Sequence, residues 1–273
     1  MELIRAIEEN AAELLLRMGA AGGGEQRDDK VRWTIGGSPI DYHNAVVAAD
    51  LSDDEADLVI AESIKRFEAN GVPGSWHVGP SMRPSDLGDR LLTAGFTHGG
   101  SEPGMAIDLT QLTDPSDPRP VLRIVRVRAA DVLATWAATL AQGFGEGPKE
   151  AEWVAEVYGS EGFDDPWRHY LAYRDDEPVA TATIFLAAGV AGVYFVMTVP
   201  TARRQGIGAA ITLHALREAR DSGIPYAVLG SSPAGRSVYE SLGFKTYCEI
   251  DLYEWSSGVP AVDGGGASFP AQD

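Results

Sequence analysis

Cysteine is nearly absent: Cys248 is the only one among 273 residues. A lone cysteine excludes a framework of intramolecular disulfides and is typical of a reducing compartment. The N-terminus also lacks a basic segment followed by an apolar one, and residues 1–19 have the pattern of an amphipathic helix instead. The sequence therefore predicts a cytoplasmic protein without a signal peptide.

Basic residues are scarce as well. Lys and Arg number 22 against 40 Asp and Glu, which gives a net charge of −18. This balance speaks against a nucleic-acid partner, because phosphate backbones require Lys/Arg surfaces. An acidic surface suits a cationic partner such as an amine, since it raises the local concentration of that partner. The same acidity would also serve solubility alone, so both interpretations stay open.

One stretch, residues 178–202, contains no charged residue. About 20 apolar residues can span a bilayer. This stretch, however, is rich in Val, Thr, Ile and aromatic residues, and Gly189 and Gly192 interrupt it. We therefore expect two buried strands joined by a tight turn and no membrane span.

The chain divides into two parts of similar size. Residues 111–120 contain three prolines and two aspartates without apolar periodicity, which is typical of a linker. Residues 257–273 are rich in Gly, Ser and Pro, which predicts a disordered tail. The expected domains are thus residues 1–110 and 121–256, with a loop at 19–30 after the first helix.

The two parts repeat one pattern. Gly71-Val72-Pro73 corresponds to Gly223-Ile224-Pro225, and "LLTAGF" at 91–96 corresponds to "YESLGF" at 239–244. In both parts the expected order is helix, G-x-P turn, short strand, helix, Gly-Phe and strand. This order predicts an internal duplication of one α/β unit. In the second part, a meander of strands at 122–128, 167–185 and 192–199 adds a mixed sheet flanked by helices.

A glycine loop follows the last strand of this meander. Arg203, Arg204, Gln205, Gly206 and Gly208 lie between that strand and a helix at 206–222. A helix N-terminus offers unpaired N–H groups and partial positive charge, glycines let a ligand approach the backbone, and arginines pair with phosphate oxygens. The pattern predicts an anion site. It is not a P-loop, because no Lys-Ser/Thr follows, and Ile211 replaces the third glycine of a dinucleotide loop.

The loop resembles the acetyl-CoA loop of the GNAT family of N-acetyltransferases, which has the pattern Arg/Gln-x-x-Gly-x-Gly/Ala. Val199-Pro200 before the loop and the helix "VYESLGF" after it agree with the family, over about residues 122–255. The resemblance implies a tandem GNAT (acyl-CoA N-acyltransferase) fold with a mixed, mostly antiparallel central sheet flanked by helices in two domains.

The resemblance also implies a role for each matching residue. Tyr239 would protonate the departing thiolate, and Ser232 would bind the CoA arm or only cap the next helix. The remaining positions would bind the pantetheine arm, the acetyl carbonyl and the pyrophosphate through the strand and the loop: Val196, Met197, Thr198, Val199, Arg203, Arg204, Gln205, Gly206, Ile207, Gly208 and Ala209.

The general base is less clear, because the strand before the loop carries no carboxylate. Tyr194 is its only ionisable group, and its ordinary pKa suits a base poorly. Glu146, Asp164 and Asp165 are further candidates, as are a water chain and an acceptor that arrives neutral. No histidine has metal-ligand spacing, so we expect no metal.

The resemblance thus implies an acetyl-CoA-dependent N-acetyltransferase that acts on a primary amine of a small molecule by direct attack in a ternary complex. In the first part, Asp53, Asp54 and Glu55 fall where the glycine loop should be and would repel a pyrophosphate, so this part is expected to be degenerate. The alternatives are a non-catalytic acyl-CoA-binding or effector-sensing protein and a transferase of a longer acyl group. A homodimer stays open beside a monomer.

Overall fold

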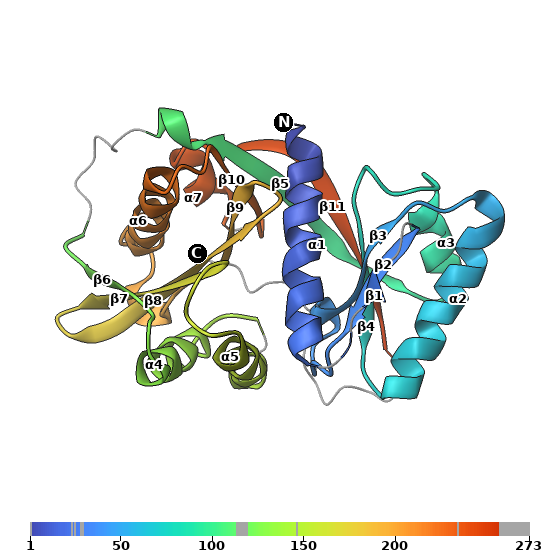
Figure 1. Cartoon of the computed structure of the whole chain (residues 1–273), viewed down its shortest axis with the longest axis horizontal. Coiled ribbons are helices and arrows are strands. Elements are labelled where there is room, and N and C mark those ends of the chain that lie inside the picture. The colour runs from blue at the N-terminus through green and yellow to red at the C-terminus, as the bar shows by residue number, and fades with distance from the viewer. Residues whose placement is uncertain are drawn as a thin grey trace. The chain divides into compact units, whose positions relative to one another are not determined.

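A computed structural model describes residues 2–22, 24, 26–27, 30–112, 120–145, 147–233 and 235–256. Most of the expected linker at 111–120 and all of the expected tail at 257–273 lie outside these residues. The described residues form two compact units (Figure 1). Of the described residues, the C-terminal unit holds 103–247 and the start of the chain up to Ala11, and the N-terminal unit holds Ala12–Glu102 and residues 248–256.

The sheet of the C-terminal unit has the order β5-β10-β9-β8-β7-β6. Its first strands form the expected antiparallel meander: β6 (Arg123–Arg126), β7 (Trp167–Arg174), β8 (Glu177–Ala187) and β9 (Val190–Thr198). Strand β10 (Tyr226–Gly230) runs parallel to β9 and antiparallel to β5 (Thr97–Asp108). The charge-free stretch therefore forms two buried strands, with Ala188 and Gly189 as the turn between them.

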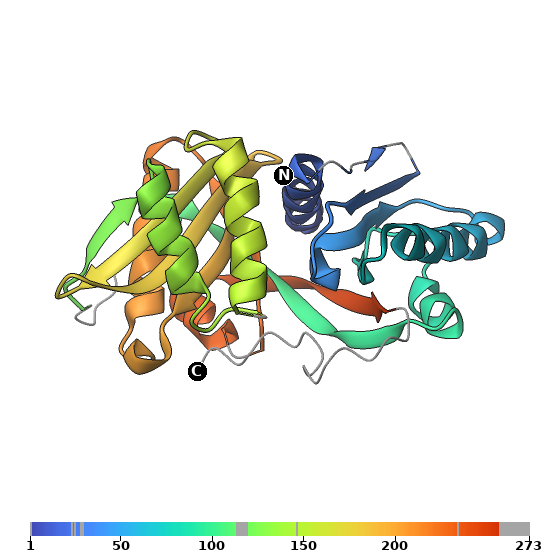
Figure 2. The same ribbon diagram turned by 90° about the horizontal axis from the view of Figure 1, so that it is seen from below.

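Helices cover both faces of this sheet. The helices α4 (Ala130–Leu140) and α5 (Pro148–Glu161) pack on one face, and α6 (Ile207–Asp221) packs on the other (Figures 1 and 2). The short helix α7 (Arg236–Ser241) follows β10. Each long helix turns its apolar residues to the sheet, which is how an amphipathic helix buries surface.

The sheet of the N-terminal unit has the order β1-β2-β3-β4-β11. It comprises β1 (Gln26–Arg27), β2 (Val31–Ile35), β3 (Asn44–Ala49), β4 (Gly74–Val78) and β11 (Lys245–Trp255). Strands β3 and β4 are parallel, and β4 and β11 are antiparallel. The helices are α1 (Leu3–Ala21), whose residues up to Ala11 belong to the C-terminal unit, α2 (Asp53–Asn70) and α3 (Leu87–Thr93). Because α1 continues to Ala21, the expectation of a loop from residue 19 is wrong by three residues.

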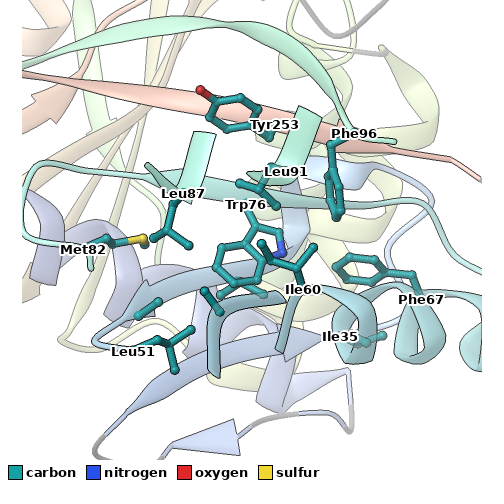
Figure 3. Close-up of a cluster of buried hydrophobic side chains, with 13 residues drawn as sticks. Ile35, Leu51, Ile60, Phe67, Trp76, Met82, Leu87, Leu91, Phe96 and Tyr253 are labelled. Carbon is teal, nitrogen blue, oxygen red and sulfur yellow. The ribbon is translucent and has the colours of Figure 1, made fainter. Parts of the chain in front are cut away.

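Trp76 of β4 lies in the core of the N-terminal unit (Figure 3). Ile60 and Phe67 of α2 and Leu87 and Leu91 of α3 pack around it. The indole is fully buried, and its Nε1 donates to Ser63 Oγ at 3.0 Å. This bond satisfies the one polar group of the indole, which would otherwise be costly to bury.

The expected duplication is present in the order of the elements. Helix α2, the Gly71 turn, β4, α3 and β5 match α6, the Gly223 turn, β10, α7 and β11. Each turn glycine has a positive φ, 63° at Gly71 and 89° at Gly223, which explains why both turns carry glycine. The closing strands are exchanged, however: Gly104–Asp108 of β5 pairs with β10, and Asp251–Trp255 of β11 pairs with β4.

Candidate functional site

Strand β9 contains a bulge just before the predicted site. Thr181 of β8 faces Met197 and Thr183 faces Tyr194, so Ala182 alone is opposite Phe195 and Val196. Phe195 has a φ of 49°, which is uncommon for a residue with a side chain, and Thr181 Oγ1 donates to its carbonyl at 2.8 Å. Bulges re-aim the residues that follow them and are frequent beside active sites.

The bulge lies beyond the point where β9 and β10 are paired. Their parallel register covers Ala191 with Ala227 and Gly192 with Val228, and no later pair joins these two strands within the described residues. The N–H of Val199 donates to Val179 O at 2.9 Å and thus faces β8. Because N–H directions alternate along a strand, the N–H of Thr198 faces the opposite side, away from β8.

The predicted glycine loop, residues 199–206, connects β9 to α6. It begins with a 3-10 turn, Pro200–Ala202, and contains two residues with positive φ, Arg204 at 57° and Gly206 at 73°. Gly206 is the N-cap of α6, and the first turn of this helix has no acidic residue. The first intrahelical bond is donated by Ala210 to Gly206 O at 3.0 Å. The N–H groups of Ile207, Gly208 and Ala209 are therefore left for an external acceptor.

The two arginines of the loop have different surroundings. Arg204 is exposed, whereas Arg203 is partly buried. Arg203 Nε donates to Thr198 O at 3.1 Å, and its Nη2 donates to Gly143 O at 3.3 Å. The next residue, Gln205, accepts a hydrogen bond from Arg174. The Arg203 side chain therefore links the loop to the end of β9 and to the turn between α4 and α5.

Tyr239 and Ser232 lie after β10. Tyr239 is 8% exposed, its ring packs against Phe244 at 5.8 Å between centroids, and burial raises its phenol pKa well above the ordinary value. A phenol with such a pKa is protonated at neutral pH and can act as a proton donor. Ser232 Oγ accepts from the N–H of Gly235 at 3.1 Å, so it stabilises the turn before α7.

The candidate bases have diverse environments. Asp165 forms ion pairs with Arg168 at 2.8 Å and Arg126 at 3.1 Å, and Arg168 is the main cause of its lowered pKa. Tyr194 donates its hydroxyl proton to Asn10 Oδ1 at 2.7 Å. Asp164 is exposed, and Glu146 lies outside the described residues.

Two buried carboxyl groups were missed in the sequence. Glu150 of α5 is 5% exposed, and Glu102 of β5 is 8% exposed. Burial raises the pKa of Glu102 to about 8. The spacing of Glu150, Val154 and Tyr158 is a helical i, i+4, i+8 series and could have placed Glu150 on the inner face. No comparable local signal exists for Glu102.

The N-terminal unit lacks the loop at the corresponding place. Only residues 50–52 connect β3 to α2, whereas eight residues, 199–206, connect β9 to α6. The backbone of Arg83 lies beside the end of β3 and pairs with it. The Arg83 N–H donates to Ala49 O at 3.0 Å, and the Arg83 carbonyl accepts from Leu51 N–H at 3.2 Å. Helix α2 begins instead with Ser52, whose N–H donates to Glu55 Oε2 at 3.0 Å.

Within the described part of the chain, no group of three or more His, Cys, Asp or Glu side chains is arranged to hold a metal ion. Among the helices that the structure describes, none has the length and apolar character needed to cross a membrane.

Comparisons with known proteins agree with this geometry. The model of the acetyltransferase (GNAT) family matches residues 134–244. A mycothiol acetyltransferase from Nocardiopsis dassonvillei is 32% identical over 173 residues, 56% of this chain and 52% of that protein. The chain spans about half the length of the mycothiol acetyltransferases that it matches.

Solved structures show the same fold. A GCN5-related N-acetyltransferase from Kribbella flavida has a TM-score of 0.69 at 20% identity and covers 91% of this chain and 97% of its own. A tandem GNAT protein from the clavulanic acid biosynthesis pathway has a TM-score of 0.58 at 14% identity over 85% of this chain and 79% of its own. The expected mixed α/β fold is confirmed, and residues 134–244 belong to the GNAT family of acetyltransferases.

Proposed function

We propose that this chain transfers the acetyl group of acetyl-CoA to a primary amine of a small molecule, by direct attack in a ternary complex. The observation that carries the proposal is the connection from the bulged end of β9 through residues 199–206 to the N-terminus of α6. Three consecutive free N–H groups at a helix N-terminus without a nearby acidic side chain suit a pyrophosphate. The mycothiol acetyltransferases at 30–32% identity support acetyl transfer.

The residues of the site then have separate tasks. The backbone of Val196, Met197, Thr198 and Val199 lies along the pantetheine arm, and an N–H there stabilises the oxyanion that develops on the acetyl carbonyl. Ser232 lies where the arm leaves the site. The loop and first helical turn bind the pyrophosphate with the following residues: Arg203, Arg204, Gln205, Gly206, Ile207, Gly208 and Ala209.

The chemical step conserves protons and electrons. The neutral amine nitrogen forms a bond to the acetyl carbon, and the bond from that carbon to sulfur breaks. The departing thiolate takes a proton from the Tyr239 hydroxyl, and the nitrogen, which becomes positively charged in the attack, gives up a proton that restores this hydroxyl. An acceptor that arrives as an ammonium must first lose one further proton to a base. A buried phenol suits its part of this exchange, because protonation of the thiolate prevents the reverse attack.

We also propose that residues 1–110 are a GNAT-like domain without a CoA site and that residues 121–256 are the catalytic domain. The short connection at residues 50–52, the backbone of Arg83 beside β3, and the acidic first turn of α2 support this division. An anion at the start of α2 would meet Asp53, Asp54 and Glu55.

The test is an assay of thiol release from acetyl-CoA with a panel of amines: aminoglycosides, polyamines, amino acids and peptide N-termini. Gly206→Glu places a side chain and a negative charge at the proposed pyrophosphate site. Gly223→Glu is the matched control, because Gly223 also has a positive φ and open space around it, at the other end of α6. We expect release that Gly206→Glu abolishes and Gly223→Glu retains.

A second candidate is a non-catalytic acyl-CoA-binding protein, which the lack of a carboxylate on β9 favours. In that case the wild-type protein binds acetyl-CoA in calorimetry, Gly206→Glu loses this binding, and no amine releases thiol. Absence of acetyl-CoA binding in the wild-type protein would contradict both candidates.

A further inference from the structure

We propose that Glu150 is the general base, that is, the carboxylate that receives the proton of the acceptor's ammonium group. This inference rests on the proposed acetyl transfer and names the residue that β9 does not supply. It follows from where Glu150 lies, from which elements meet there and from the side chains around it.

Glu150 lies on the buried face of α5 near its beginning. Val154 and Tyr158 follow at the i+4 and i+8 positions, and both are fully buried. The exposed carboxylates of the same helix, Glu152 and Glu156, lie on the other face. Glu150 thus directs its carboxylate into the interior of the unit.

The turn between α4 and α5 connects Glu150 to the proposed site. A methyl group added at Gly145 would lie 1.7 Å from Glu150 Oε2, so the carboxylate packs directly on the backbone of this turn. In the same turn, Gly143 O accepts from Arg203 of the glycine loop at 3.3 Å, and the Phe144 ring lies 5.3 Å from the ring of Phe195 at the bulge of β9. Three successive residues of this turn, 143–145, therefore contact the loop, the bulge and the carboxylate.

The side chains around Phe195 and Tyr158 are aromatic. Phe195 also packs against Tyr158, at 5.8 Å between ring centroids, and against Trp136 at 6.1 Å. Aromatic faces and one carboxylate together favour a protonated amine over a neutral or anionic group. The Tyr158 hydroxyl is fully buried and has no hydrogen-bond partner among the described residues.

The titratable groups around Tyr158 come from three elements. Glu150 shares α5, Tyr194 lies on β9 with its hydroxyl bonded to Asn10, and the ring of His169 on β7 lies 4.1 Å from the Tyr158 ring. Burial lowers the pKa of His169 to about 3, so this ring is neutral. Burial raises the pKa of Tyr158 far above its ordinary value, and electrostatic interactions with Tyr194 and Glu150 add to that effect. Tyr158 therefore stays neutral, and the proton of the ammonium has Glu150 as its acceptor. The deprotonated nitrogen then attacks the acetyl carbon as described above.

The experiment compares Glu150→Gln with wild-type protein on two minimal probes. Ethylamine is protonated at pH 7 and needs a base, whereas methoxyamine is already neutral there. Both probes are used at high concentrations, so that weak binding of such small acceptors does not prevent their acetylation. We expect Glu150→Gln to lower kcat/KM about 100-fold or more for ethylamine. We expect little change for methoxyamine, a deficit that shrinks as pH rises, and unchanged acetyl-CoA affinity by calorimetry.

Two variants serve as controls. Glu152→Gln makes the same chemical change on the exposed face of α5 and should retain both activities. Glu102→Gln removes the other buried carboxyl group and should show no selective loss for ethylamine. If Glu150→Gln does not bind acetyl-CoA, Glu150→Asp provides the measurement, because it keeps the carboxylate: ethylamine turnover should return together with its pH profile.

Several results would overturn the assignment. An equal loss for both probes with acetyl-CoA binding intact would show a structural role for Glu150. A selective loss in Glu102→Gln or Glu152→Gln would assign the base elsewhere. A Glu150→Asp variant that binds acetyl-CoA but loses activity equally on ethylamine and on methoxyamine would also show a structural role for Glu150. Wild-type protein that binds acetyl-CoA and acetylates no amine would instead remove the proposed function itself, and the role of Glu150 with it.

Discussion

Replacing Glu102 with glutamine should make the protein more stable at high pH and change little at low pH. Glu102 is buried, and burial raises its pKa from 4.5 to about 8. Below pH 4.5 the carboxyl group is neutral in both the folded and the unfolded chain, so it carries no penalty. As pH rises towards 8, ionisation of Glu102 lowers the free energy of the unfolded chain. In the folded chain Glu102 must stay protonated or carry a buried charge, so the folded state is not stabilised in this way.

The magnitude follows from the difference between the two pKa values. A difference of about 3.5 units corresponds to about 5 kcal/mol, fully expressed above pH 8 and absent below pH 4.5. Glutamine keeps the shape of the protonated acid without the ionisation. The variant should therefore exceed the wild-type protein by up to about 5 kcal/mol at pH 9, which is on the order of 10 °C in Tm for a chain of this size.

The assay is differential scanning calorimetry of both proteins between pH 5 and pH 9. Glu68→Gln is the matched control, because Glu68 is exposed and contacts water before and after unfolding. Its Tm relative to wild-type protein should stay constant with pH. A gap between Glu102→Gln and wild-type protein that is the same at pH 5 and pH 9 would refute the argument.

Three further substitutions test the site and the core. Tyr239→Phe should lower kcat about 100-fold with acetyl-CoA affinity by calorimetry unchanged, and retained turnover would contradict a role in protonating the thiolate. Arg203→Ala loses the bonds to Thr198 O and Gly143 O, so acetyl-CoA binding should weaken, and equal affinity would exclude a role in positioning the loop. Ser63→Ala leaves the indole N–H of Trp76 unpaired, and urea unfolding should show a loss of about 1–3 kcal/mol, whereas a neutral result would mean that the indole finds another acceptor.

Features that depend on local chemistry were predictable from the sequence. The turns at Gly71 and Gly223 were recognised because a positive φ at the end of a helix favours glycine. The glycine loop predicts a helix from Gly206, and α6 begins one residue later, at Ile207. In the charge-free stretch, alternation and β-branched residues were enough to favour two strands over a membrane span. In each case a few adjacent residues determine the backbone.

Features that depend on distant parts of the chain were not predictable. Nothing near Gly104 indicates that its partner is Gly230, because strand pairing is decided by register across the sheet. The positive φ at Phe195 results from the bulge against Ala182, and a bulge has no sequence signature of its own here. The burial of Glu102 likewise depends on what packs over it, so its altered pKa could not be read from its neighbours in sequence.

The exchanged closing strands constrain how the chain can be made and divided. Strand β4 receives its antiparallel partner only when residues 251–255 have been synthesised, so the edge of β4 stays open while the whole second half emerges from the ribosome. A gene cut at residues 111–120 would yield two products that each carry a strand belonging to the other. The duplication thus produced halves that need each other to be complete, much as two protomers do after swapping a segment.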